Sequence, residues 1–371
     1  MITFHYIKQA REVQYSKRVN DQIHRIFRRN KVTVNLSSRP AAHEDFFPFF
    51  DACYHDARAD QGLRHAVEHE WHFLLDSQAA ISLVVEDRSR PPHSRLVGCA
   101  QLAFVTRRFT KTARAIQEPW VNARLDRLLP DGSSPLLAPD QIARANAASG
   151  LSTLFTRWHR ADRLLGPEEM LETNLFMLDA FQSYCRGYRF REMLIEATGE
   201  AARDQGLRAG FRQVCDYAEY YREHPPLPPP AQRPFLMGLT REEALTTDGC
   251  VMSYYFVHRS PRFGLTASQQ ALLGLSLRQP NLSDVALAAE LGVPVHRVKN
   301  LLRAVYRQIS EVHFDLLPEM GEGSRGLEKK QRLLLYLRDH PEELRPYRPA
   351  RQLGAGVARP ELKEAAEVKK G

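Results

Sequence analysis

Cysteine is scarce in this chain, and its spacing excludes two classes of protein. The five cysteines are far apart and include no Cys-x-x-Cys pair: Cys53, Cys99, Cys185, Cys215 and Cys250. An odd and scattered set builds neither the disulfide framework of a small secreted domain nor a cysteine-rich zinc site. We therefore expect a protein of the reducing cytoplasm.

Long hydrophobic runs are also lacking. No stretch of the sequence approaches the ~20 apolar residues of a membrane helix, and the first residues carry charge too early for a signal peptide. The chain also has no serine-hydrolase elbow and no phosphate-binding P-loop. We expect no membrane partner, and these common catalytic classes are excluded.

The composition is that of a globular protein with a basic balance. The chain has 371 residues, of which 43% are hydrophobic and 26% are charged, and its formal net charge is +8. This length suits two domains or one large domain with extensions. A positive balance is compatible with a nucleic-acid partner.

Residues 265–309 predict three short helices joined by tight connections. Thr266 and Ser283 are suited to cap the first and second helices, because their hydroxyls accept a free backbone N–H. Gly292 supplies the turn before the third helix, and Pro294 stands at its start. Two helices joined by a short turn that contains glycine are typical of a helix-turn-helix.

The third of these helices has one apolar and one basic face. At about 100° per residue, the polar face gathers His296, Lys299, Asn300, Arg303 and Arg307 opposite Val298, Leu302, Val305 and Ile309. With Arg297, these polar residues are our candidates for binding DNA, since Lys and Arg meet phosphates or guanine and Asn reads adenine. The alternative is an ordinary solvated face.

This stretch resembles the LuxR-type helix-turn-helix of bacterial transcription regulators. The matching positions are Leu265, Thr266, Leu287, Ala288, Leu291, Gly292, Val293, Val298, Lys299, Val305, Tyr306 and Arg307. Pro294 and Leu301 depart from the family pattern. The resemblance implies sequence-specific binding to double-stranded DNA. It also implies a fourth helix, which in some members forms the dimer contact.

Residues 327–340 predict this fourth helix. Leu327, Gln331, Leu334 and Leu337 fall on one side of it. That side could form a homodimer, or it could pack back on the first helix at Leu272 and Leu275.

The longer N-terminal region predicts strands and helices in alternation. We expect strands and helices in this order: a strand at 32–36, helices at 43–60 and 63–76, a hairpin of 81–86 and 96–105, a strand at 150–158, a helix at 166–186, a strand at 193–197, a helix at 201–212, and strands at 216–221 and 235–239. Residues 107–146 predict irregular structure.

This order resembles the GNAT acyltransferase superfamily over residues 32–240, with a local match at Gly210 and Phe211. The resemblance places Arg163 and Gly166 in a loop that would bind the pyrophosphate of coenzyme A at a helix N-terminus. Glu168 and Glu169 follow, and their charge would repel that phosphate. We therefore expect no cofactor, although coenzyme A or an acyl-CoA remains open.

Four other features stand out along the chain. Residues 1–31 predict a basic amphipathic helix, residues 224–234 a proline-rich linker or loop, and residues 346–371 a disordered tail. His65, His69 and His72 share a helix face at a spacing that could hold zinc. We favour a polar helix face and assign no metal.

Together these observations predict an α+β protein. A GNAT-like mixed α/β domain (32–240) would precede an all-α LuxR-type domain (260–345). We expect a transcription regulator whose first domain senses a small-molecule ligand or provides assembly contacts. The alternative is an acyl-CoA-dependent N-acyltransferase, or an enzyme like the acyl-homoserine-lactone synthases, whose helical domain binds DNA or a partner. Glu168 and Glu169 favour the regulator, and no catalytic residue can be selected.

Overall fold

The computed structural model describes residues 34–54, 60–128, 134–313, 316 and 326–348. The helix expected at 1–31 and nearly all of the tail expected at 346–371 lie outside the described residues.

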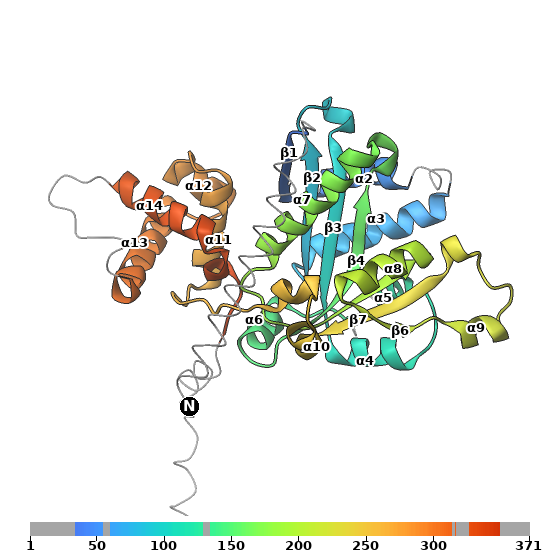
Figure 1. The fold of residues 1–371 in the computed structure, drawn as a ribbon. Coiled ribbons are helices and arrows are strands. Elements are labelled where there is room, and N and C mark those ends of the chain that lie inside the picture. The colour runs from blue at the N-terminus through green and yellow to red at the C-terminus, as the bar shows by residue number, and fades with distance from the viewer. Residues whose placement is uncertain (1–33, 55–59, 129–133, 314–315, 317–325, 349–371) are drawn as a thin grey trace, which may run out of the picture.

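The centre of the molecule is a seven-stranded mixed sheet with the order β1-β2-β3-β4-β5-β7-β6 (Figure 1). Its strands are β1 (Leu36–Pro40), β2 (Ala80–Asp87), β3 (Leu96–Val105), β4 (Leu151–Arg160), β5 (Phe190–Thr198), β6 (Arg212–Cys215) and β7 (Pro234–Thr240). Neighbours are antiparallel except for β4 and β5, which run parallel. The crossover between these two strands is a helix, as parallel pairing requires.

Helices cover both faces of the sheet (Figure 1). One face carries α2 (Phe46–Cys53), α3 (Gln61–Asp76), α4 (Arg107–Ala115) and α5 (Val121–Leu128). The other face carries α6 (Pro139–Ala147), α7 (Pro167–Cys185), α8 (Glu200–Ala209) and the 3-10 helix η6 (Val251–Phe256). The short helices α9 (Ala218–Glu223) and α10 (Arg241–Thr246) flank β6 and β7.

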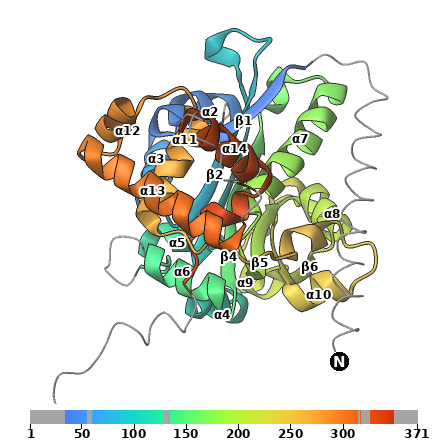
Figure 2. The same ribbon diagram turned by 90° about the vertical axis from the view of Figure 1, so that its left-hand side faces the viewer.

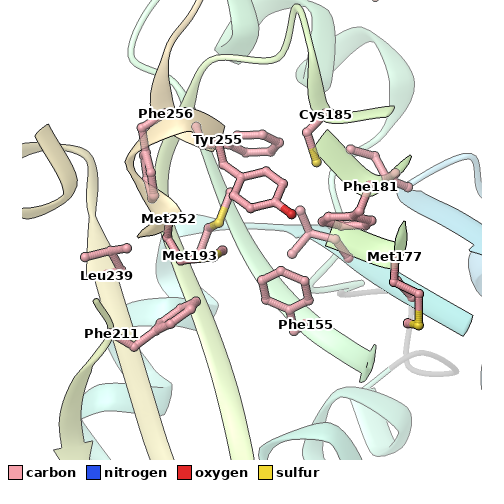
Figure 3. Packing of buried hydrophobic residues seen from close by; sticks show 14 of the residues in the cluster. Phe155, Met177, Phe181, Cys185, Met193, Phe211, Leu239, Met252, Tyr255 and Phe256 are labelled. Carbon is pink, nitrogen blue, oxygen red and sulfur yellow. The ribbon is translucent and has the colours of Figure 1, made fainter. Parts of the chain in front are cut away.

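The largest apolar core lies between the sheet and α7 (Figure 3). Phe155 from β4 and Phe181 from α7 meet in a tilted pair with ring centroids 5.5 Å apart. Gly98 on β3 allows α7 to approach closely, because a Cβ there would lie 2.6 Å from the sulfur of Met177. Close packing of this kind fixes the position of α7 on the sheet.

Four further helices follow near the C-terminus and lie together beside the sheet (Figures 1 and 2). They are α11 (Ala267–Arg278), α12 (Asp284–Glu290), α13 (Val295–Val312) and α14 (Gly326–Asp339). The two expected caps are confirmed: Thr266 accepts from the Gln269 N–H, and Ser283 accepts from the Ala286 N–H. Gly292 has a φ of +63°, which suits the tight turn between α12 and α13.

The apolar side of α14 is buried inside this helical group. Leu333 and Leu337 are fully buried and pack with Leu273 of α11 and with Val305 and Ile309 of α13. The observed packing is therefore onto the chain's own helices, and Leu334 is 6% exposed. The side chain of Leu327 is not among those that the structure describes. The homodimer stays a prediction.

The segment after α14 contacts the end of α7. Arg186 donates to the carbonyl oxygen of Asp339 at 2.6 Å and to a carboxylate oxygen of Glu342 at 3.3 Å. Arg345 in turn donates to the Arg186 carbonyl oxygen at 3.0 Å. Gly187, with a φ of +86°, lies so close to Glu342 that a Cβ would be 2.4 Å from its Cα. These contacts join the last described residues to the sheet-bearing part.

Several boundaries expected from the sequence are wrong. The first strand is at 36–40 and not at 32–36, because its register pairs Leu36 with Asp87 and Pro40 with Leu83. Residues 107–146, expected to be irregular, hold α4, α5 and most of α6. In α4, Thr106 caps the helix through the Phe109 N–H.

One further assignment also needs correction. The strand expected at 216–221 is α9, and the edge strand is β6, four residues upstream. On α7, Met177 and Phe181 are fully buried against the sheet, whereas Leu171 is 50% exposed.

The α+β class is confirmed, and the expected order of strands and helices holds except for the additional helices α4, α5, α6 and α9. The proline-rich residues 224–234 form most of the connection between the paired strands β6 and β7. They are therefore a loop between two strands of the sheet. The division into two domains stays a prediction. Across the described residues, no helix is long and apolar enough to span a membrane.

Candidate active site

The two parallel strands diverge at a β-bulge. In the β3–β4 ladder, Gln101 faces Arg157 and Leu102 faces Phe155, so Thr156 is an extra residue of β4. A bulge bends its strand and increases the local twist. The last β4–β5 pair is Phe155 with Ile195, directly before this bulge. The bulge therefore coincides with the point where β4 leaves β5.

The start of α5 bridges both strands at this point. The side-chain amide of Asn122 donates to the carbonyl oxygen of Thr156 at 3.3 Å. The carboxylate of Glu196, the first β5 residue beyond the last pair, accepts from the N–H groups of Trp120 at 2.8 Å and Val121 at 2.9 Å. In sheets with parallel strands, ligands bind beyond the carboxyl ends of those strands. This is that end of the β4–β5 pair.

Glu196 is a half-buried carboxylate with one further donor. The hydroxyl of Tyr217, which is fully buried, donates to Glu196 Oε1 at 2.8 Å. Burial raises the pKa of Glu196 above its usual range, while the hydrogen bond from Tyr217 and those from Trp120 and Val121 act in the opposite direction. A carboxylate with a raised pKa is suited to accept a proton near neutral pH.

The backbone is strained at two residues that donate hydrogen bonds to Glu196. Trp120 has a φ of +67° and Tyr217 a φ of +57°, and both donate to the Glu196 carboxylate. Among the described residues, only Gln78 shares this positive φ without being glycine. Bulky residues in this region cost of order 1–3 kcal/mol each and cluster at functional sites. The strain aims two donors at one carboxylate.

Polar atoms near Glu196 also lack partners. Asn122 Oδ1, both terminal nitrogens of Arg124 and the hydroxyl of Tyr221 are buried and make no hydrogen bond to any described residue. Arg124 is close enough to lower the pKa of Glu196 through its charge. Unsatisfied buried polar groups are costly and are usually paired. We call Glu196, Tyr217, Asn122, Arg124 and Tyr221 the divergence site.

A buried ion pair holds the bulge from the side of α3. Arg157 of β4 pairs with Glu70 of α3, and both side chains are almost completely buried. Arg157 also donates to Gln101 Oε1, which accepts from the Thr156 hydroxyl at 3.1 Å. This network fixes the extra residue in place. Glu70 is thus paired with Arg157, and the carboxylate of Asp60 caps α3 through the Leu63 N–H, so neither is available as a general base.

The predicted cofactor loop is closed by the protein itself. The N–H of Gly166, at the start of α7, donates to Glu169 Oε2 at 2.8 Å, and Arg90 donates to the same oxygen at 3.2 Å. Arg163 is exposed in the preceding 3-10 helix (Asp162–Leu164). A helix N-terminus attracts anions through such N–H groups. Because a carboxylate already occupies it, this end of α7 does not fit a pyrophosphate.

The predicted DNA-binding residues share one exposed surface. His296, Arg297, Lys299, Asn300, Arg303 and Arg307 are all exposed along α13. Val298, Leu302, Val305 and Ile309 are buried on its other side, as expected. Arg303 donates to Asn300 Oδ1 at 3.4 Å, the one hydrogen bond between these side chains in the described part of the chain. We call these six exposed residues the α13 surface.

The histidines considered for zinc do not form a site. His65 and His69 are exposed, while His72 contacts His43 and lies 3.9 Å from Glu68. Within the described ranges no group of three or more His, Cys, Asp or Glu side chains could hold a metal ion.

Comparisons with known proteins gave structural matches only. No protein-family profile and no curated protein sequence matches the chain. The C-terminal condensation domain of Ebony, in complex with beta-alanyl-dopamine, is 14% identical and covers 56% of this chain and 100% of its own, with a TM-score of 0.35. FeeM, an N-acyl amino acid synthase from uncultured soil microbes, is 10% identical over 59% of this chain and 97% of its own, with a TM-score of 0.32.

A spermidine N-acetyltransferase SpeG chimera, made from the Vibrio cholerae and hSSAT proteins, is 13% identical over 57% of this chain and 99% of its own, with a TM-score of 0.32. These scores are low, so the GNAT-like description of the sheet part stands on its own strand order and on its single parallel pair.

Sequence reasoning missed the divergence site. The strands expected at 193–197 and 216–221 contain Glu196 and Tyr217, but neither residue was a candidate for function. The available signal was a glutamate among the apolar residues 193–197. Its partners are Trp120, Val121 and Tyr217, which only the fold brings together.

Proposed function

We propose that this chain transfers an acyl group from a thioester to an amine at the divergence site. The observation that carries the proposal is Glu196: a half-buried carboxylate held by two strained residues where β4 and β5 diverge. The order of strands and helices, which resembles that of the GNAT acyltransferases, supports the same reaction class. The proposal takes up the alternative that the sequence left open.

In this mechanism Glu196 accepts a proton from the attacking neutral amine and later releases that proton to solvent. The amine nitrogen forms a bond to the thioester carbonyl carbon, and the carbon–sulfur bond breaks to give an amide and a thiolate. A proton from solvent then completes the thiol. Tyr217 is a positioning residue, because its hydroxyl holds Glu196 Oε1. Arg124, whose terminal nitrogens have no hydrogen-bond partner among the described residues, is placed to bind the oxygen of the acyl donor.

The N-terminus of α7 favours an acyl donor that has no pyrophosphate to bind there. Glu169 would have to leave the Gly166 N–H and Arg90 before an anion could bind. A small acyl thioester without phosphates needs no such rearrangement. We therefore expect coenzyme A to bind weakly.

The test compares two donors with one acyl group, acyl-coenzyme A and the acyl thioester of N-acetylcysteamine, against a panel of amines. Release of free thiol and formation of amide are both measured. We expect amine-dependent release with the small thioester and no large advantage for coenzyme A. If neither donor reacts with any amine, acyl transfer is wrong. If coenzyme A alone reacts and Arg163→Ala abolishes the reaction, the donor assignment is wrong.

A second function is favoured by the α13 surface. Its six polar side chains are exposed and include four fixed cations and no carboxylate. A helix of this kind fits the major groove, where Arg contacts guanine and Asn contacts adenine. We propose that it binds double-stranded DNA, in the manner that the resemblance to LuxR-type regulators implies.

Selection from a randomised DNA library at two salt concentrations tests this second proposal. We expect an enriched sequence whose affinity falls with rising salt, because phosphate contacts release counterions. Binding that shows no enriched sequence would contradict base reading by α13.

A further inference from the structure

A basic hollow lies at the end of the parallel strands β4 and β5 that is opposite to the divergence site. A hollow of about 750 Å³ opens between the start of α4, the start of β5 and α10. Its volume lies within the ~300–1,000 Å³ typical of small-molecule sites. Arg191 and Glu192 stand at the beginning of β5, whereas the divergence site is at its carboxyl end. The two sites are therefore distinct.

The cations in this hollow outnumber its carboxylates. Arg107, Lys111, Arg191 and Arg241 line it, together with Glu192 and Glu242. The side-chain nitrogens of Arg107, Lys111 and Arg191 make no hydrogen bond or ion pair within the described part of the chain. Three cations without partners around one concave surface leave a strong positive potential.

Among the described residues, Glu192 forms no ion pair with the cations that line the hollow, and its only charged partner is Arg114. Its Oε1 accepts from the hydroxyls of Thr110 and Ser152, each at 2.8 Å, and its Oε2 lies 3.4 Å from Arg114. Arg114 does not line the hollow. Glu242 is exposed at the rim. The net charge that faces the hollow is thus positive.

We propose that this hollow binds a small molecule that carries two or more negative charges, as phosphates or carboxylates. Arg191, which is half-buried on β5, and Lys111, which is exposed on α4, provide the main contacts. Charge-assisted hydrogen bonds from guanidinium and ammonium groups are the strong ones for such anions. A small ligand fits better than a polymer, since the cations converge on a bounded hollow.

Calorimetric titration of the full chain tests this site with two probes, inorganic pyrophosphate and citrate, at low and at physiological ionic strength. We expect at least one probe to bind, and the ratio of the two affinities distinguishes phosphate from carboxylate ligands. Arg191→Gln and Lys111→Gln should each raise the Kd about tenfold. The control Arg108→Gln removes the same charge from α4 outside the hollow and should leave the Kd unchanged.

Two results would overturn the proposal. One is that neither probe binds at low ionic strength. The other is that Arg108→Gln weakens binding as much as Arg191→Gln, which would indicate attraction by general surface charge. Thermal unfolding of each variant confirms that it is folded before titration. Because the readout is binding alone, its outcome is independent of acyl transfer.

Discussion

The divergence site and the α13 surface differ in almost every physical property. The first is centred on a half-buried carboxylate. Around it lie two strained residues and several polar atoms that have no hydrogen-bond partner among the described residues. The second is an exposed face of a regular helix with cations and no carboxylate. Strain and burial tune a single proton acceptor, whereas exposure and uniform charge suit contact with a large anionic surface. In the two functions proposed above, the first region performs the chemistry and the second recognises DNA.

Removal of the Glu196 charge should have the largest effect. Glu196→Gln keeps the shape of the side chain but cannot accept the proton, so kcat/KM for acyl transfer should fall by about 10²–10⁴-fold. DNA binding should not change. The measurement is amide formation from the small thioester under saturating amine.

The matched control is Glu219→Gln, which removes a carboxylate that is exposed on α9 close to Tyr217 in sequence. Its rate should equal that of the natural protein. Equal losses in both variants would mean that the effect is not specific to the divergence site.

Replacement of two cations and the amide on α13 should weaken DNA binding and leave acyl transfer unchanged. The triple change Lys299→Ala, Asn300→Ala and Arg303→Ala should weaken binding to the selected DNA by at least about tenfold, since each base contact is worth ~1–3 kcal/mol. Acyl transfer should be unaffected.

Arg338→Ala serves as its control, because Arg338 is exposed on α14, off the α13 surface. Gel-shift titrations of both variants decide the matter. If the triple variant retains full affinity, DNA binding through α13 is wrong.

A substitution in the core of the C-terminal helices tests whether they unfold separately from the sheet. Leu337 is fully buried between α11, α13 and α14, so Leu337→Ala should lower the free energy of unfolding of these helices by ~2–5 kcal/mol. Leu335→Ala, on the same helix but 58% exposed, should change it by less than about 0.5 kcal/mol. Hydrogen exchange should place the loss in α11–α14 and leave β4 and β5 protected. Uniform loss throughout the chain would show that the two parts unfold as one unit.

The sequence predicted the elements whose signal is local. The strand at 96–105 matches β3 residue for residue, because nine apolar or small residues and Gln101 stand between a proline turn and a capping threonine. The caps Thr266 and Ser283 and the two faces of α13 also follow from neighbouring residues. Such features depend on hydrogen bonds and periodicity within a few positions.

The divergence site depends on features that no local pattern contains. The bulge at Thr156 comes from the register of β3 against β4. The positive φ of Trp120 and Tyr217 is unusual for bulky residues, and the helices around 107–147 were missed because their apolar faces are short. The register and the strain appear only when Glu196 is placed beside α5.

The smallest expected effect is a pH dependence of the free energy of unfolding that comes from Glu196. Its folded pKa is raised by burial, so the folded state holds the proton more tightly than the unfolded state. The corresponding stability is fully present below the unfolded pKa of about 4.3 and is lost as pH rises through the folded pKa. Glu196→Gln should remove this part of the pH dependence in thermal unfolding. An unchanged profile would contradict the raised pKa.

The most direct test of Glu196 as proton acceptor is a carbon-13 NMR titration of its carboxyl group, assigned by its disappearance in Glu196→Gln. The acyl-transfer rate is measured on the same samples. We predict that the carboxyl titrates above about 4.3 and that the rate rises through the same midpoint, because only the ionised form accepts the proton. A carboxyl that titrates below that value, or a rate midpoint that persists in Glu196→Gln, would contradict the account.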